Sequence, residues 1–330
     1  MGRRMNITPA DAVRVPAERL RTFVRAVLDR VGMEEENATL LAGLLVSNDL
    51  RGVFSHGTRQ VATYARDMRA GRLNPRPKVR MESEGPATFV VEGDGGLGYF
   101  PAHAAARALV DRAKAVGVAA AVTRNHGHIG AAGIYTRIGA AAGLIAYATS
   151  GHQLAMAPGL PLAAAAGGSP HSFAVPTGQE PPFVLDFGAM HDLYAGDPYG
   201  AALFKLAPGL VFRSIGLGAV CQSVGGVLAG VPARAERAGA GFPGANQGAF
   251  LFAVDIERFQ PVADFRREMD DYIRQVHELA PPTGYAAATL PGEPEWRREQ
   301  AWATEGVPVG KGHQEVLRSL GEELGVEPPV

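Results

Sequence analysis

Two histidines stand in glycine-rich surroundings where a side chain could reach a ligand. His56 lies in Ser55-His56-Gly57, and His128 lies in the run from Asn125 to Gly133. Imidazole has an unperturbed pKa of about 6.5, so it can donate or accept a proton near neutral pH. A histidine that reaches a ligand can therefore act as a general acid or base. The alternative for an isolated histidine is a hydrogen-bonded structural group.

Arg59 is a candidate for binding a substrate carboxylate. It follows His56 by three residues. The planar guanidinium of arginine can hold a carboxylate through two parallel hydrogen bonds. A solvated surface arginine is the alternative.

Metal and thiol chemistry are less well supported. His126 and His128 form a His-x-His pair, but no carboxylate is near them in the sequence, so we expect no metal site. The single cysteine, Cys221, excludes an intramolecular disulfide and a cysteine-built zinc site. Its apolar surroundings predict a buried structural thiol.

The segment from Gly93 to Gly98 fits the dinucleotide fingerprint G-x-G-x-x-G, after a predicted strand and before a predicted helix. Pro101 stands where the helix should present N–H groups to a pyrophosphate, and proline has none. The next strand ends in Thr123-Arg124-Asn125, without an acidic residue for a ribose hydroxyl. We therefore interpret these glycines as a turn and reject a Rossmann site.

The composition is that of an ordinary globular enzyme. The chain has 330 residues, of which 46% are apolar and 20% charged, enough for two or three packed units. A net charge of −1 gives no basic excess for a phosphate backbone, so we expect no nucleic-acid partner. No signal-like apolar segment follows the N-terminus, and the uncharged stretches 138–179 and 214–233 are interrupted by polar residues, glycine or proline. We expect a cytoplasmic protein without a membrane partner.

The elements that must position these residues follow from the hydrophobic periodicity. Amphipathic helices are predicted around 20–31, from about residue 34, and at 60–70. Further along, the predicted strands are 87–92, 117–123, 143–149, 172–175, 182–186 and 249–254, and the predicted helices are 102–116, 131–142, 265–279 and 314–324. This alternation indicates an α/β core.

Three separated segments are together similar to a known family. They are Ser55-His56-Gly57 with Tyr64 and Gly71, Asn125 to Gly133 with Tyr135, and Leu290-Pro291-Gly292-Glu293 followed by Gly306-Val-Pro-Val. In order and spacing they resemble the malate/L-lactate dehydrogenase family from about residue 17 to 325. That family includes ureidoglycolate dehydrogenase, diketogulonate reductase, sulfolactate dehydrogenase and piperideine-carboxylate reductase.

The resemblance implies an α/β fold that is not a Rossmann fold. It implies a mixed, largely antiparallel sheet, a separate helical domain and a homodimer. We expect the helical domain to be discontinuous, with residues 1–85 and 262–330, and the α/β core to hold residues 86–261.

The resemblance also implies an NAD(P)-dependent oxidoreductase that interconverts a small 2-oxo acid, or a cyclic imino acid, with the 2-hydroxy or amino acid. The implied catalytic residues are Ser55, His56, Arg59 and His128, with His56 as proton donor and acceptor. The implied cofactor-binding residues are Ser150, Asp186, Arg213, Gly292 and Glu293. The choice between NAD and NADP is left open.

This chain departs from the family pattern at several positions. Gln60 stands where many relatives have arginine, and Gly167-Gly168-Ser169-Pro170 replaces G-T-N-P. Arg213 replaces a lysine, and the segment 186–213 is much shorter than in relatives. These departures support an alternative function: a non-redox descendant, either a binding protein or a histidine acid–base enzyme, with a degraded nicotinamide site.

Overall fold

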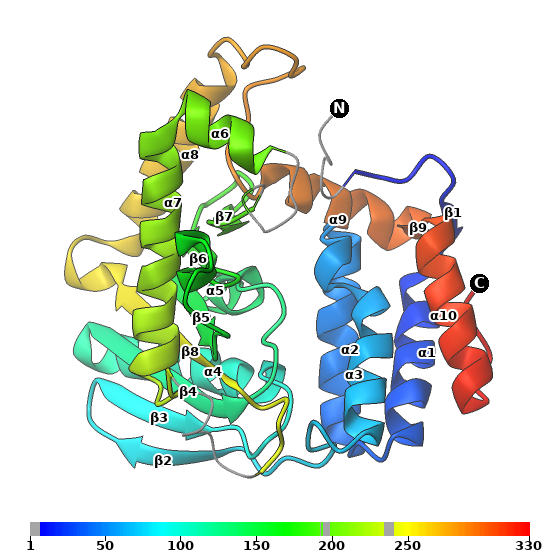
Figure 1. Ribbon diagram of the computed structural model, residues 1–330. Helices are drawn as coiled ribbons and strands as arrows, with labels where there is room; N and C mark the ends of the chain where they lie inside the picture. The colour runs from blue at the N-terminus through cyan, green and yellow to red at the C-terminus, as the bar shows by residue number, and fades with distance from the viewer. Residues whose placement is uncertain (1–6, 192, 194–198, 234–240) are drawn as a thin grey trace. The chain divides into compact units, whose positions relative to one another are not determined.

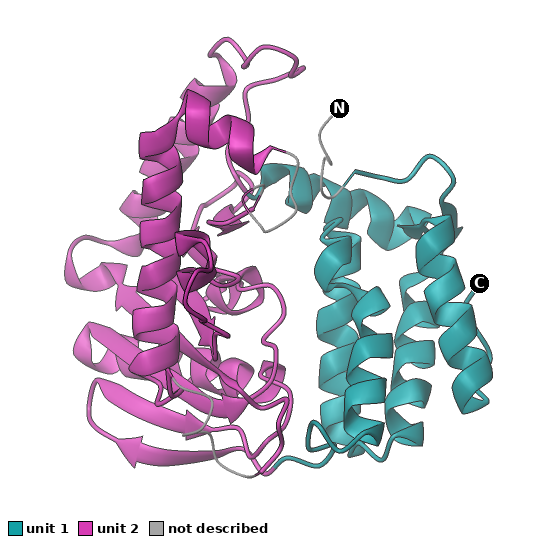
Figure 2. Ribbon diagram, viewed as in Figure 1, with its two compact units in different colours: residues 1–77, 292–330 teal, residues 78–291 magenta. Residues whose placement is uncertain are grey.

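The computed structural model describes residues 7–191, 193, 199–233 and 241–330. It divides into two compact units, residues 1–77 with 292–330 (unit 1) and residues 78–291 (unit 2), which Figure 2 colours separately. Unit 1 is discontinuous, and the predicted helical domain was residues 1–85 with 262–330. The segments 78–85 and 262–291 belong to unit 2, and the contacts of β2 and α8 explain why.

β2 (Arg80–Glu84) pairs with β3 (Thr88–Glu92) and so belongs to the sheet. α8 (Val262–His277) is attached to unit 2 through Asp270, which accepts hydrogen bonds from the backbone N–H groups of Gly178, Gln179 and Glu180. Burial alone would raise the pKa of Asp270. The hydrogen bonds from the three backbone N–H groups stabilise the ionised carboxylate and keep its pKa below the usual value. Neither contact could be predicted from the local periodicity of these segments.

Unit 1 consists of helices and one small sheet (Figure 1). Its α-helices are α1 (Ala17–Arg30), α2 (Glu35–Leu50), α3 (Val61–Arg69), α9 (Glu293–Glu305) and α10 (Lys311–Leu324), and the antiparallel pair is β1 (Val13–Val15) with β9 (Val307–Val309). Helix α1 buries one stripe of apolar side chains at helical spacing, including Leu20, Val24 and Val27, against its neighbours. Two short 3₁₀ turns, η1 (Phe54–His56) and η2 (Thr58–Gln60), connect α2 to α3 and contain the Ser55-His56-Gly57 motif.

Unit 2 is built on a seven-stranded sheet with the order β2-β3-β4-β8-β5-β6-β7. The remaining strands are β4 (Val118–His126), β5 (Leu144–His152), β6 (Pro170–Val175), β7 (Phe183–Gly188) and β8 (Gln247–Asp255). Only β3 and β4 are parallel, and the other neighbouring pairs of described strands are antiparallel. The sheet is therefore mixed and largely antiparallel, which confirms the expected fold class and excludes a doubly wound Rossmann sheet.

Helices cover both faces of this sheet. On one face α4 (Tyr99–Val116) and α5 (Gly133–Ala141) pack on the central strands. On the other face lies α7 (Pro208–Cys221), which continues into a π-helical turn, η4 (Gln222–Val227) (Figure 1). The alternation along β5 separates the two faces, because Ala146 meets Gly139 of α5 whereas Tyr147 is directed toward His171 and the α7 side.

Helix α7, which follows the short helix α6 (Gly200–Leu206), was not predicted from the sequence. Together with η4 it forms the stretch Pro208–Val227, which is long and apolar enough to cross a membrane by length and composition alone, and 33% of it is buried. Its buried residues include Val211 and Ile215, which pack with Ala166 and Met190 in a small core cluster. Proline at the first helical position starts the helix, as its fixed φ angle favours.

Candidate active site

The Ser55-His56 motif is held by side chains from both of its flanks. Asn48, in the last turn of α2, donates from Nδ2 to the backbone oxygen of His56 at 2.9 Å. Gln60 donates from Nε2 to the backbone oxygen of Ser55 at 2.6 Å. Gln60 therefore fixes the loop at the position where relatives are expected to carry arginine. Both carbonyl oxygens therefore have hydrogen-bond donors, which hold the loop from α2 and from η2.

The Ser55 hydroxyl oxygen lies 2.9 Å from Nδ1 of His56. When Nδ1–H donates to this oxygen, Nε2 is left as the atom that gains and loses a proton. In this tautomer the serine accepts from Nδ1–H in both protonation states of the ring, so proton exchange at Nε2 needs no rearrangement of the contact. Burial lowers the pKa of His56 below its usual value, so the neutral ring predominates at pH 7.

Arg59 lies on η2 with an exposed side chain. Its charge is the second cause, after burial, of the lowered pKa of His313 on α10, about 4. Ser55 and His56 lie on η1 and Arg59 lies on η2, the next turn of unit 1. An exposed guanidinium three residues after His56 is a group that could bind an anionic substrate.

A group missed by the sequence analysis lies beneath this loop. Asp49 is fully buried and accepts hydrogen bonds from the backbone N–H and the hydroxyl of Thr58. The same hydroxyl lies 3.0 Å from Nε2 of His313. Asp49 precedes the motif by few residues, but His313 is far along the chain, so only the fold brings the three together.

In unit 2, the turn that carries His128 rests on the glycine loop from Gly93 to Gly98. Gly95 N–H donates to the oxygen of Asn125 at 2.9 Å, and Gly98 N–H donates to the oxygen of His128 at 3.1 Å. Gly127 N–H in turn donates to the oxygen of Gly96 at 2.8 Å. These donors are used within the protein, so they are not available to a pyrophosphate. The loop is a turn, as interpreted from the sequence, and it supports the His128 segment.

His126 and His128 differ in their surroundings. His126 is fully buried, with Nε2 at 2.8 Å from Thr123 Oγ1 and Nδ1 at 2.7 Å from the oxygen of Gly127. Burial lowers its pKa to about 4, which describes a neutral structural histidine. His128 is half-buried, and its ring meets the ring of Tyr99 edge-on at 6.5 Å. Over the described residues, no cluster of three His, Cys, Asp or Glu side chains could hold a metal ion.

Asp186 on β7 lies at the beginning of α5. Its Oδ2 accepts a hydrogen bond from the backbone N–H of Gly133 at 2.9 Å, and its side chain is exposed. A carboxylate at a helix N-terminus is favoured by the helix dipole. Because the His128 turn leads directly into α5, Asp186 and His128 belong to the same corner of unit 2.

The other predicted cofactor residues are distributed over several elements. Ser150 on β5 is buried beneath η4, since a Cβ on Gly225 would lie 2.8 Å from the Ser150 Cα. Arg213 is exposed on α7, and no carboxylate of the described residues pairs with it. In unit 1, Gly292 has a left-handed conformation before α9, and Glu293 is buried and paired with Arg297. The three residues in unit 2 therefore lie on different elements, Asp186 on β7, Ser150 on β5 and Arg213 on α7.

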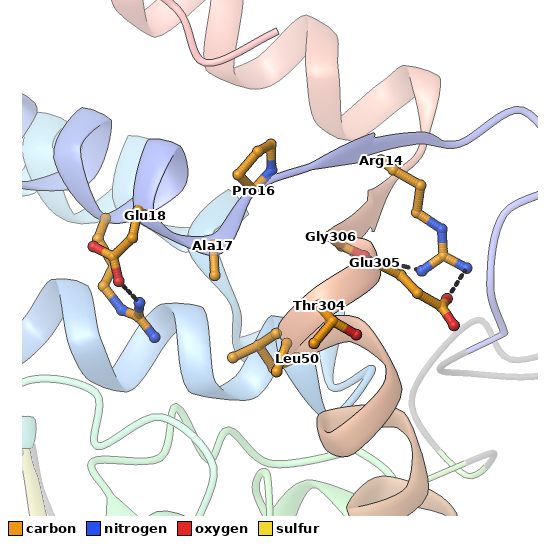
Figure 3. Close-up of a pocket in the computed structure, with 10 residues that line it drawn as sticks. Arg14, Pro16, Ala17, Glu18, Leu50, Thr304, Glu305 and Gly306 are labelled. Carbon is orange, nitrogen blue, oxygen red and sulfur yellow. Dashed lines mark hydrogen bonds and ion pairs between the residues drawn. The ribbon is translucent and has the colours of Figure 1, made fainter.

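Two cavities lined by described residues contain arginines, but these arginines are already in ion pairs with glutamates of the protein. A cavity of about 420 Å³ in unit 2 includes Arg124, but this side chain is paired with Glu82 and Glu92. In unit 1, a pocket of about 350 Å³ lies near Arg14 and Arg21 (Figure 3). These two arginines are paired with Glu305 and Glu18, respectively. We assign neither cavity to the substrate.

The chain is similar to known dehydrogenases over nearly its whole length. The model of the family described as malate/L-lactate dehydrogenase matches residues 15–190 and 197–318. Malate dehydrogenase of Pyrococcus horikoshii is 26% identical, with 96% of each chain covered. L-sulfolactate dehydrogenase of Methanocaldococcus jannaschii is 27% identical, covering 91% of this chain and 94% of the relative. NAD⁺-dependent ureidoglycolate dehydrogenase of Escherichia coli is 23% identical, covering 90% and 93%.

The solved structures agree with the sequence comparisons. The structure of the Pyrococcus horikoshii malate dehydrogenase superposes with a TM-score of 0.81 at 25% identity and covers 98% of both chains. The break in the family match, at residues 191–196, falls inside the segment 186–213 that the sequence analysis describes as shortened. With the motif order, the mixed sheet and the matched length in agreement, the chain belongs to the malate/L-lactate dehydrogenase family.

Proposed function

We propose that the protein interconverts a small 2-oxo acid, or a cyclic imino acid, with the corresponding 2-hydroxy or amino acid, with His56 as proton donor and acceptor. The observation that supports this most directly is the contact between Ser55 Oγ and His56 Nδ1 at 2.9 Å. With Nδ1–H donating to the serine oxygen, Nε2 is the ring atom that would exchange a proton with the substrate. In the reducing direction, the His56 imidazolium gives this proton to the carbonyl oxygen; in the oxidising direction, the neutral ring accepts it from the hydroxyl.

Arg59 is the proposed partner of the substrate carboxylate. Its exposed guanidinium can form two parallel hydrogen bonds to a carboxylate, which would orient the carbonyl toward His56. We propose His128 as a second acid–base group. Ser55, His56, Arg59 and His128 are then the catalytic set.

The cofactor we propose is NAD or NADP, which supplies or accepts the hydride at the substrate carbon. We propose that Ser150, Asp186, Arg213, Gly292 and Glu293 hold it. The exposed guanidinium of Arg213 suits a phosphate group, and the exposed carboxylate of Asp186 suits a hydroxyl or amide donor. The relative named as an NAD⁺-dependent enzyme supports a nicotinamide cofactor without choosing between its two forms.

One observation favours a second candidate. A Cβ on Gly225 would lie 2.8 Å from the Ser150 Cα, so the backbone of η4 lies directly against this part of β5. Close packing there is consistent with a non-redox descendant that has lost part of the nicotinamide site and retains histidine acid–base chemistry.

We propose that the protein acts as a cytoplasmic homodimer with small molecules as partners and no membrane or nucleic acid. Helix α7 supports a second copy as partner, because Leu210, Phe212 and Val220 on it are exposed apolar side chains. Light scattering after size-exclusion chromatography would give twice the chain mass for a dimer. A monomer, or a protein recovered only with detergent, would contradict this proposal.

Fluorescence titration of the purified protein with NADH, and separately with NADPH, tests the proposed function. Saturable binding at micromolar concentration is expected for one of them, followed by turnover in a screen of 2-oxo acids and cyclic imino acids. His56→Ala is expected to bind the cofactor but to abolish turnover. Absence of binding by a folded protein would favour the non-redox alternative.

A further inference from the structure

Asp49, Thr58 and His313 form a buried chain of side chains in unit 1. Asp49 Oδ2 accepts from Thr58 N–H at 3.0 Å and is 2.5 Å from Thr58 Oγ1. Thr58 Oγ1 is 3.0 Å from His313 Nε2. Asp49 and Thr58 are 0% exposed and His313 is 8% exposed. The chain therefore connects α2, η2 and α10 without solvent.

This chain lies directly beneath the residue that follows His56. A Cβ added to Gly57 would overlap the Asp49 carboxylate, so the carboxylate packs against the Gly57 backbone. Asp49 Oδ1, on that side, has no hydrogen-bond partner in the described part of the chain. Asn48, one residue earlier, donates to the His56 oxygen. The last turn of α2 thus holds the loop on both sides of His56.

The Thr58 hydroxyl has one proton and two neighbours that can accept it. With Asp49 ionised, the hydroxyl donates to Oδ2, and His313 Nε2–H donates to Thr58 Oγ1. With Asp49 protonated, Oδ2–H donates to Thr58 Oγ1, and the hydroxyl donates to His313 Nε2, with His313 in its other neutral tautomer, which carries the proton on Nδ1. The ionised state holds Thr58 more strongly, because hydrogen bonds to a charged acceptor are stronger than neutral ones.

Burial raises the pKa of Asp49 to about 7, against the opposing hydrogen bonds from Thr58. Burial, with the Arg59 charge, lowers the pKa of His313 to about 4, so this ring stays neutral while Asp49 titrates. The other charged groups at this end of α2 come from α9 and the helix terminus. They are the Arg51–Glu299 pair and Arg298 with its neighbour Glu295.

We propose that Asp49, acting through Thr58 and His313, positions the His56 loop, and that the loop is held in its active orientation when Asp49 is ionised. The inference rests on the role of His56 in the proposed function. Asp49 does not touch the substrate in this account; it is a positioning residue.

Histidine NMR tests the network without any activity. The Cε1–H resonance of His56, identified with His56→Gln, is expected to show two inflections with pH, its own and a second near pH 7 from Asp49. Asp49→Asn should remove only the second. Asp67→Asn, a carboxylate-to-amide change at an ion-paired residue of the same unit, is the matched control and should keep both. A single inflection in the unmodified protein, or two in Asp49→Asn, would overturn the proposal.

Kinetics separate positioning from a merely structural role. Thr58→Val removes the hydroxyl at nearly constant volume and should lower kcat roughly tenfold with the KM for cofactor unchanged, because a misplaced general acid slows the chemical step. Thr58→Ser should restore most of this rate. Equal loss in both variants would count against the network. If the NMR shows both inflections but no 2-oxo or 2-hydroxy acid is turned over, the proposed function fails and the positioning network stands.

Discussion

The backbone N–H of Gly133 donates a 2.9 Å hydrogen bond to Oδ2 of Asp186, which joins the first residue of α5 to β7. A Cβ on Gly133 would lie 2.5 Å from the same oxygen, so a larger residue there would displace the carboxylate from this hydrogen bond. The Asp186 carboxylate therefore lies at the N-terminus of α5, the helix that follows the His128 turn, where the helix dipole favours a negative charge.

Gly133→Ala is therefore expected to reduce the free energy of unfolding by about 1–3 kcal/mol, as overpacking of a close contact does. Asp186→Asn keeps the acceptor but loses the charge and should cost less than about 1 kcal/mol. Urea denaturation followed by circular dichroism measures both. If Gly133→Ala proved as stable as the unmodified protein, the contact would not constrain the turn.

The pH dependence of turnover follows from His56. Oxidation of the hydroxy acid needs the neutral ring, and since burial lowers the pKa of His56 below its usual value, protonation of His56 itself should stop oxidation only below pH 6.5. Protonation of Asp49 should add a separate, partial loss near pH 7, and Asp49→Asn should remove that inflection. Reduction needs the imidazolium and should fall as pH rises through the lowered pKa of His56. Profiles of kcat/KM in both directions measure this value. An inflection of His56 above its usual pKa would contradict the burial argument.

The fold class could be predicted from the sequence. The order of the three motifs implies the family, and the family resemblance implies a mixed, largely antiparallel sheet. The alternation of residues 87–149 also predicts β3, α4, β4, α5 and β5 close to their observed positions. Helix α7 was missed because its glycines and apolar residues, from Pro208 onward, give little amphipathic periodicity.

The motif around His56 was predictable, but its support was not. Thr58 and His313 lie on η2 and α10, and no local pattern connects positions so far apart along the chain. The burial of Asp49 likewise depends on the packing of α2 within unit 1, and an aspartate in the sequence is ordinarily expected at the surface. Long-range hydrogen bonds of this kind are a property of the fold.

The glycine loop gives a direct test of the rejected Rossmann interpretation. Gly95 has φ of +75°, and a Cβ there would overlap the ring of Phe242. Gly95→Ala should thus cost about 1–3 kcal/mol of stability through strain and overpacking. The dissociation constant of NADH, measured well below the melting temperature, should stay unchanged. Weakened cofactor binding by a fully folded Gly95→Ala would place the dinucleotide at this loop.

Acid sensitivity should arise from His126. Burial lowers its folded-state pKa to about 4 from 6.5, so the contribution of the neutral ring is lost as pH falls through this window. The loss amounts to up to about 3 kcal/mol. His126→Asn should be less stable at pH 7 but should show a shallower decline between pH 6.5 and 4, measured by urea denaturation. A parallel decline in both proteins would exclude His126 as the cause.

Asp49 should act with the opposite sign. Its folded-state pKa of about 7 exceeds the usual 3.8, so its contribution to stability is complete at low pH and is lost as pH rises through about 4 to 7. Ionisation of this buried carboxyl should cost up to about 4 kcal/mol at pH 8. Relative to the unmodified protein, Asp49→Asn should therefore gain stability between pH 5 and 8 while its kcat falls, because the charge that destabilises the fold is the charge that holds Thr58. Urea denaturation and turnover should be measured on the same samples. If Asp49→Asn loses activity and stability together at every pH, Asp49 contributes only to packing.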